Sequence, residues 1–90
     1  MKLNKFATTA ATIVMEAFAA YAAKNDLSTD SDGINRALLI MRANTRAGLD
    51  AAMSDAKQAI DAGMPDAAAA TFRASMTLIG IASAKQYAEG

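Results

Sequence analysis

Apolar side chains recur every three or four residues along most of this chain, and two short polar stretches interrupt the pattern. An α-helix repeats every 3.6 residues, so this spacing places the apolar side chains on one face of a helix. The interruptions are NDLSTDSDG at 25–33 and DAGMP at 61–65. We therefore predict helices near 3–24, 33–62 and 65–88. They should form one all-α domain, either a three-helix bundle or an extended helical hairpin plus an N-terminal helix.

Each predicted helix carries a stripe of side chains that should face a core. In the first helix, lysines, threonines and Glu16 occupy the opposite face. The stripes are Leu3, Phe6, Ile13, Val14, Phe18 and Tyr21; then Ile34, Leu38, Met41, Thr45, Leu49, Ala52, Ala56, Ala59 and Ile60; then Ala69, Phe72, Met76, Ile79, Ser83 and Tyr87. Small residues spaced i,i+4 would allow helix backbones to approach closely: Ala19–Ala23, Ala47–Ala51 and Gly80–Ala84.

The polar stretch before the second helix has two interpretations. Ser28–Asp32 supplies side chains that cap helix N-termini, and Gly33 tolerates unusual backbone angles. Alignment of Gly33 to position 6 of a calcium-binding EF-hand loop puts Ser28, Asp30 and Asp32 at ligand positions, but position 12 is then Leu39 instead of glutamate. We therefore predict a helix-capping linker and no metal site.

The second interruption has the residues of a helix end followed by a helix start. Gly63 suits the position just past a helix C-terminus, and Pro65 suits the first turn of the next helix. Asp66 would then lie near the positive end of the dipole of that helix.

The composition leaves a small core and surplus apolar side chains. Alanine supplies 24 of the 90 residues; it favours helix but buries little area. A chain this short buries only about 60% of its unfolded surface. Four large aliphatic residues also fall outside the predicted stripes: Leu39, Ile40, Leu78 and Ile81. We predict that these four form an interface with a second copy or another protein, the alternative being that a central helix of the bundle is buried on two sides.

Three arginines of the second predicted helix suggest an anion site. Arg42 and Arg46 are neighbours at i,i+4, and Arg36 lies on the same broad side. Arginine binds carboxylates and phosphates through two parallel hydrogen bonds. The alternative is salt bridges to Asp50, Asp26 or a neighbouring subunit. No aromatic side chains for stacking on bases are interleaved with these arginines, which argues against nucleic acid. Two ion pairs are predicted on the exposed side of the helix: Arg46–Asp50 and Lys57–Asp61.

Several classes of function are excluded or disfavoured by composition. The chain has no cysteine and no histidine, so disulfides, thiol catalysis, zinc ribbons and Ser-His triads are ruled out. Nine Lys+Arg balance nine Asp+Glu, so no net field attracts nucleic acid or an anionic membrane. No nucleophile stands beside a base, and we expect neither enzymatic activity nor a cofactor.

The N-terminal segment resembles neither a signal peptide nor a membrane span, because Glu16 and three threonines interrupt it. We accordingly expect a cytoplasmic protein, or one within a soluble assembly, with no transmembrane segment.

The sequence thus favours a non-enzymatic structural or interaction protein. It would self-associate as a homo-oligomer, or dock into a larger assembly, through its alanine-rich helical faces. A small phage protein or assembly component would fit this description. The alternative is a small helical binder or inhibitor that uses the arginines to hold an anionic ligand, nucleic acid or an acidic protein surface.

Overall fold

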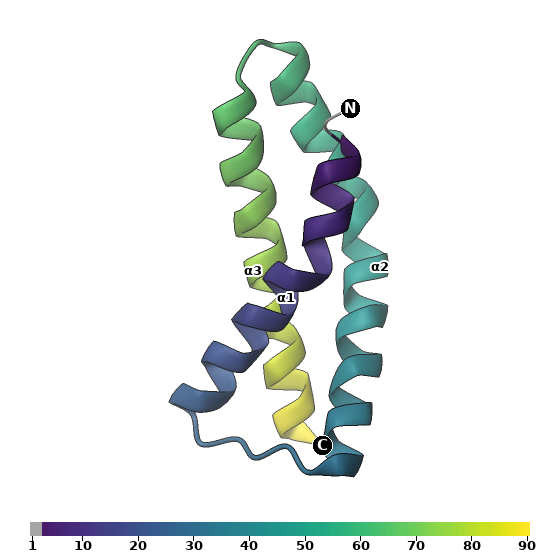
Figure 1. Cartoon of the computed structure of the whole chain (residues 1–90), viewed down its shortest axis with the longest axis vertical. Coiled ribbons are helices and arrows are strands. Elements are labelled where there is room, and N and C mark those ends of the chain that lie inside the picture. The colour runs from purple at the N-terminus through teal and green to yellow at the C-terminus, as the bar shows by residue number, and fades with distance from the viewer. Residues whose placement is uncertain (1–2) are drawn as a thin grey trace.

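The chain folds into three helices packed against one another, which confirms the predicted all-α three-helix bundle (Figure 1). The computed structural model describes residues 3–90, with side chains from Thr9 onward. The helices are α1 (Leu3–Lys24), α2 (Ser31–Asp61) and α3 (Pro65–Glu89). Helices α2 and α3 form an antiparallel hairpin, and α1 crosses it diagonally (Figure 1). The described chain measures 44 × 21 × 17 Å.

The start of α2 is fixed by an aspartate cap. Asp30 is the N-cap residue, and its Oδ1 accepts a hydrogen bond of 2.7 Å from the backbone N–H of Gly33. This satisfies one of the N–H groups that a helix leaves unpaired at its first turn. The predicted capping linker is therefore present, and α2 begins at Ser31, two residues earlier than predicted. Gly33 lies inside the helix, where a β-carbon would overlap the hydroxyl of Tyr87.

The end of α2 follows the predicted glycine and proline. Gly63 adopts the left-handed conformation with φ of 79°. The N–H of Met64 then donates to the carbonyl of Ala59 at 2.8 Å, and Pro65 begins α3. This is the hydrogen-bond pattern of the Schellman motif, which pairs carbonyl groups left over at a helix C-terminus.

Helix α1 ends in the same way, but with an aspartate where glycine is favoured. The N–H of Leu27 donates to the carbonyl of Ala22 at 2.9 Å, and Asp26 takes φ of 56°. A β-carbon makes this conformation unfavourable, although aspartate tolerates it better than most residues.

Replacement of Asp26 by glycine should therefore stabilise the protein. We expect Asp26→Gly to raise the free energy of unfolding by about 0.5–1 kcal/mol, which corresponds to a melting temperature about 2–6 °C higher. The matched control is Gly63→Asp, which places the aspartate at the equivalent position of α2, where a β-carbon would meet no atom within 4 Å. It should lower the melting temperature by a similar amount. Thermal unfolding followed by circular dichroism, at one protein concentration, measures both; equal melting temperatures for Asp26→Gly and wild type would contradict the interpretation.

Half of the described core is alanine. The large buried side chains are Ile13, Val14, Phe18, Met41, Phe72, Met76 and Tyr87, and the buried alanines are Ala10, Ala22, Ala37, Ala52, Ala56, Ala68 and Ala84. The predicted stripes of α1 and α3 agree with this core, except that Tyr21 and Ile79 are only partly buried and Ala68 replaces Ala69. The predicted Leu3 and Phe6 lie outside the described side chains.

The predicted inner face of α2 is partly wrong. Ile34 and Leu38 were expected in the core, but their side chains are 48% and 38% exposed. The inward positions at this end of α2 are instead the small residues Gly33 and Ala37. Small residues let α2 approach the C-terminal part of α3, and Tyr87 fills the space that Gly33 leaves. The helix is thereby turned so that Leu38 lies along its edge facing α1.

A buried polar contact joins α2 to α3. The Ser83 hydroxyl, fully buried, donates to the carbonyl of Ile79 at 2.7 Å and accepts from Asn44 Nδ2 at 2.9 Å. The same Asn44 nitrogen donates to Gln86 Oε1 at 3.1 Å. Polar groups buried in a core are hydrogen-bonded because an unpaired group is costly, so this contact favours one register of the two helices.

Helix α3 is long and apolar enough to cross a membrane, with a mean hydropathy of 1.2 over an 18-residue window. A third of that window is buried inside the bundle, and Phe72, Met76 and Tyr87 contribute to the core. A helix that packs against two others needs apolar side chains over much of its circumference. Packing within the bundle therefore accounts for only part of the hydropathy of α3, since two thirds of the window, which includes the exposed Leu78, lie outside the core.

Candidate functional site

A groove of about 420 Å³ lies between α1 and α2. It exists because α1 crosses the hairpin at an angle and leaves part of α2 uncovered (Figure 1). Its apolar lining consists of Ala11, Val14 and Met15 from α1 and of Leu38, Met41 and Leu49 from α2. Its polar lining comes from α2 alone and comprises Arg42, Thr45, Arg46 and Asp50. The groove therefore combines an apolar surface with a row of charged side chains along one side.

Arg42 and Arg46 have no carboxylate partner within the described chain. The predicted Arg46–Asp50 ion pair is not formed, although both residues line the groove. The predicted Lys57–Asp61 pair is formed at 2.7 Å between two exposed side chains. The two groove arginines are thus available to an anion from outside the chain, as the predicted anion site requires.

Arg36 has a different role from the other two arginines. Its Nη1 donates to the carbonyl of Tyr87 at 3.0 Å, and its guanidinium carbon lies 4.0 Å from the centre of the Tyr87 ring. The guanidinium therefore satisfies a carbonyl near the end of α3 and stacks on the aromatic face at the same time. The structure thus divides the predicted arginine cluster between a structural contact and the groove.

The four predicted interface residues differ in their exposure. Leu39 and Leu78 are 64% and 66% exposed on α2 and α3. Ile40 is partly buried and packs against the core, while Ile81 is partly buried in a smaller groove of about 260 Å³ between α1 and α3. Leu39 and Leu78 therefore remain available to a partner, whereas Ile40 mostly contacts the core of its own chain.

The sequence did not predict the exposure of Met15 and Leu38, which line the groove, or of the nearby Ile34. Met15 is 49% exposed on α1, and it lines the groove opposite Leu38. Ile34, one helical turn before Leu38, is also exposed. Ile34 and Leu38 were predicted in the core because they recur at the helical spacing of the apolar stripe. Which part of that stripe is buried depends on which residues of α2 face the other helices, and at this end of α2 these are Gly33 and Ala37.

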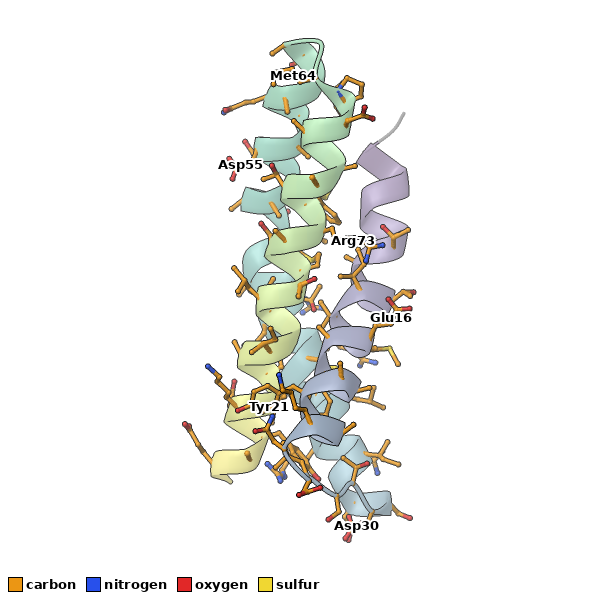
Figure 2. All side chains as sticks on the ribbon, turned by 90° about the vertical axis from the view of Figure 1, so that its left-hand side faces the viewer. Glu16, Tyr21, Asp30, Asp55, Met64 and Arg73 are labelled. Atoms are coloured by element: carbon orange, nitrogen blue, oxygen red, sulfur yellow. The ribbon has the colours of Figure 1, made fainter. Side chains whose placement is uncertain are left out.

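The described acidic side chains do not gather into a metal site. Asp30 lies at one end of the bundle, Asp55 on α2 and Glu16 on α1, well separated in Figure 2. Asp30 caps α2, and no group of three or more acidic side chains in the described part of the chain could hold a metal ion.

Comparison with protein-family models, with curated proteins and with solved structures found no match to this chain.

Proposed function

We propose that this chain is a non-enzymatic structural or interaction protein that self-associates through its exposed aliphatic side chains. The observation that carries the proposal is the number of large apolar side chains that stay exposed beside an alanine-rich core. Half of the described core is alanine, whereas six large hydrophobic residues have exposed side chains: Met15, Ile34, Leu38, Leu39, Met64 and Leu78. Burial of one such side chain contributes about 1.5–3 kcal/mol of free energy. Association that covers several of them is therefore more favourable than leaving them in water.

Leu39 and Leu78 make contacts with neighbouring copies in this proposal. They protrude from different helices, so one copy can contact two neighbours at once. A contact between unlike surfaces of identical copies produces a ring when the rotation closes and a filament when it does not. Either arrangement would suit a component of a larger assembly.

Removal of both leucines tests the proposal. The variant Leu39→Gln/Leu78→Gln should keep the helical circular dichroism spectrum of the wild type, because neither side chain belongs to the core. It should sediment as a monomer at concentrations where the wild type forms a larger species. Met64→Gln is the control, since Met64 is a 55% exposed apolar residue in the turn between α2 and α3 (Figure 2). If the double variant and the control have the same sedimentation coefficient as the wild type, these leucines are not the contact.

A further inference from the structure

The geometry points to a ligand site in the groove between α1 and α2, and to an amphipathic anion as its ligand. Such a molecule has an apolar chain and a single anionic head, as a medium-chain carboxylate does. Its lining includes the exposed Met15 and Leu38 but neither Leu39 nor Leu78, the two residues proposed above to contact other copies. The groove volume of about 420 Å³ falls within the range of about 300–1,000 Å³ that is usual for small-molecule sites.

The apolar part of the ligand would lie along Val14, Met15, Leu38 and Met41. These side chains come from two helices and face a shared space. Met15 and Leu38 keep 49% and 38% of their surface exposed in the free chain, so a bound aliphatic chain would remove apolar surface of both partners from water. Methionine is flexible and polarisable, and it adapts to ligands of varied shape.

The anionic head would lie between Arg42 and Arg46. These residues are one helical turn apart on α2, at the i,i+4 spacing that makes side chains neighbours. Neither guanidinium is paired with a carboxylate of the described chain. An anion at this place would therefore gain charge-assisted hydrogen bonds without the loss of an existing ion pair. Thr45 adds a hydroxyl group to the same lining.

Asp50 gives the groove a polarity along its length. It lines the groove one turn beyond Arg46, so an anionic head is repelled from that end and favoured nearer Arg42. This arrangement makes a prediction that an apolar surface without charge would not make: neutralisation of Asp50 should strengthen the binding of an anion.

Dodecanoate, used below the concentration at which it forms micelles, is a suitable probe. Isothermal titration calorimetry on the full chain should show saturable binding that weakens as sodium chloride is added, because salt screens exposed charges. Dodecyltrimethylammonium has the same tail and the opposite charge, and it should bind at least about tenfold more weakly. Carbon-13 labelling of the methionine methyl groups locates the site: the signals of Met15 and Met41 should shift, and that of Met64, in the α2–α3 turn, should not.

Four variants separate this site from general adsorption. Arg42→Gln/Arg46→Gln should weaken dodecanoate binding by about tenfold or more, and Asp50→Asn should strengthen it. Arg73→Gln is the matched control, because Arg73 is an exposed arginine of α3 that does not line the groove; it should leave the affinity unchanged. Leu38→Ala should weaken the binding of dodecanoate by loss of apolar contact. Circular dichroism checks that each variant is folded.

Four results would overturn the assignment. One is equal affinity for the anionic and cationic detergents, and another is equal affinity of the double arginine variant and the wild type. The third is dodecanoate binding that leaves the Met15 and Met41 signals in place. Binding of an acidic amphipathic peptide in the absence of dodecanoate binding would also reject the small-molecule site and would identify the groove as a protein-docking surface. None of these results changes the sedimentation test of self-association.

Discussion

Gly80→Ala should destabilise the protein by about 2–3 kcal/mol and lower its melting temperature by about 10–20 °C. Gly80 is buried where α1 crosses α3. A β-carbon there would lie 2.5 Å from the carbonyl oxygen of Val14 and 2.6 Å from the β-carbon of Ala17. A backbone carbonyl cannot rotate away as a long side chain can, so α1 itself would have to move. The loss should exceed the gain of about 1 kcal/mol that alanine brings to a helix interior.

Gly48→Ala is the matched control for this prediction. Gly48 also lies in the interior of a helix, but its β-carbon would meet the end of the flexible Ile79 side chain, at 2.9 Å from Cδ1. The Ile79 side chain can adopt another rotamer at modest cost. We therefore expect Gly48→Ala to be as stable as the wild type, or more stable by up to about 1 kcal/mol.

Two measurements distinguish the effects of Gly80→Ala and Gly48→Ala. Urea unfolding gives the change in free energy, and hydrogen exchange gives its location. In Gly80→Ala the amides of α1 should exchange faster than in the wild type, while those of the α2–α3 hairpin change less. Equal stability of Gly80→Ala and Gly48→Ala would show that the crossing of α1 and α3 is looser than the structure describes.

Tyr87→Ala should be the most damaging single truncation, with a loss of about 3–5 kcal/mol. The Tyr87 ring makes an edge-to-face contact with Phe18, at 5.7 Å between ring centres and 67° between planes. Its hydroxyl donates to the carbonyl of Ser28 at 3.0 Å, and Arg36 stacks on its face. One side chain thus connects α1, the α1–α2 linker, α2 and α3. A domain of this size has a total stability of about 5–13 kcal/mol, so the loss is a large share.

Conservative variants divide this effect into its parts. Tyr87→Phe keeps the ring and removes only the hydrogen bond to the Ser28 carbonyl, so it should cost about 1 kcal/mol. Tyr21→Phe is the control, because the hydroxyl of Tyr21, the other tyrosine, makes no hydrogen bond within the described residues. Chemical unfolding of the three variants measures the differences. If Tyr87→Ala loses no more than Tyr87→Phe, the ring contacts contribute little and the interpretation is wrong.

The helices and their ends could be predicted because they depend on residues near them in sequence. Asp30 caps α2 through the N–H of Gly33, three residues away, and Gly63 and Pro65 act within one turn. The helical spacing of apolar residues likewise predicted most of the residues that α3 buries in the core. These features require no knowledge of how the helices meet.

The candidate site was less predictable because it depends on contacts between distant parts of the chain. Arg36 binds Tyr87, which is 51 residues later, so its separation from Arg42 and Arg46 is invisible in a helical pattern. The exposure of Ile34 and Leu38 similarly follows from how the helices pack: Gly33 and Ala37 are the inward residues at this end of α2, and α1 crosses the hairpin where Gly80 lies. The Gly80–Ala84 pair lies at that crossing and both residues are buried, whereas Ala19–Ala23 and Ala47–Ala51 have the same spacing and are exposed. Spacing alone did not distinguish these three pairs.

We propose that this bundle, with its alanine-rich core and exposed leucines, completes the burial of its apolar surface against other copies. Sedimentation equilibrium of the unmodified chain tests it most directly, over a concentration range of at least a hundredfold in buffer free of detergent. The claim predicts a mass that rises with concentration above the 9.3 kDa of one chain and a melting temperature that rises with it, since association stabilises the folded state. A constant mass of 9.3 kDa across the whole range, with a melting temperature independent of concentration, would contradict it.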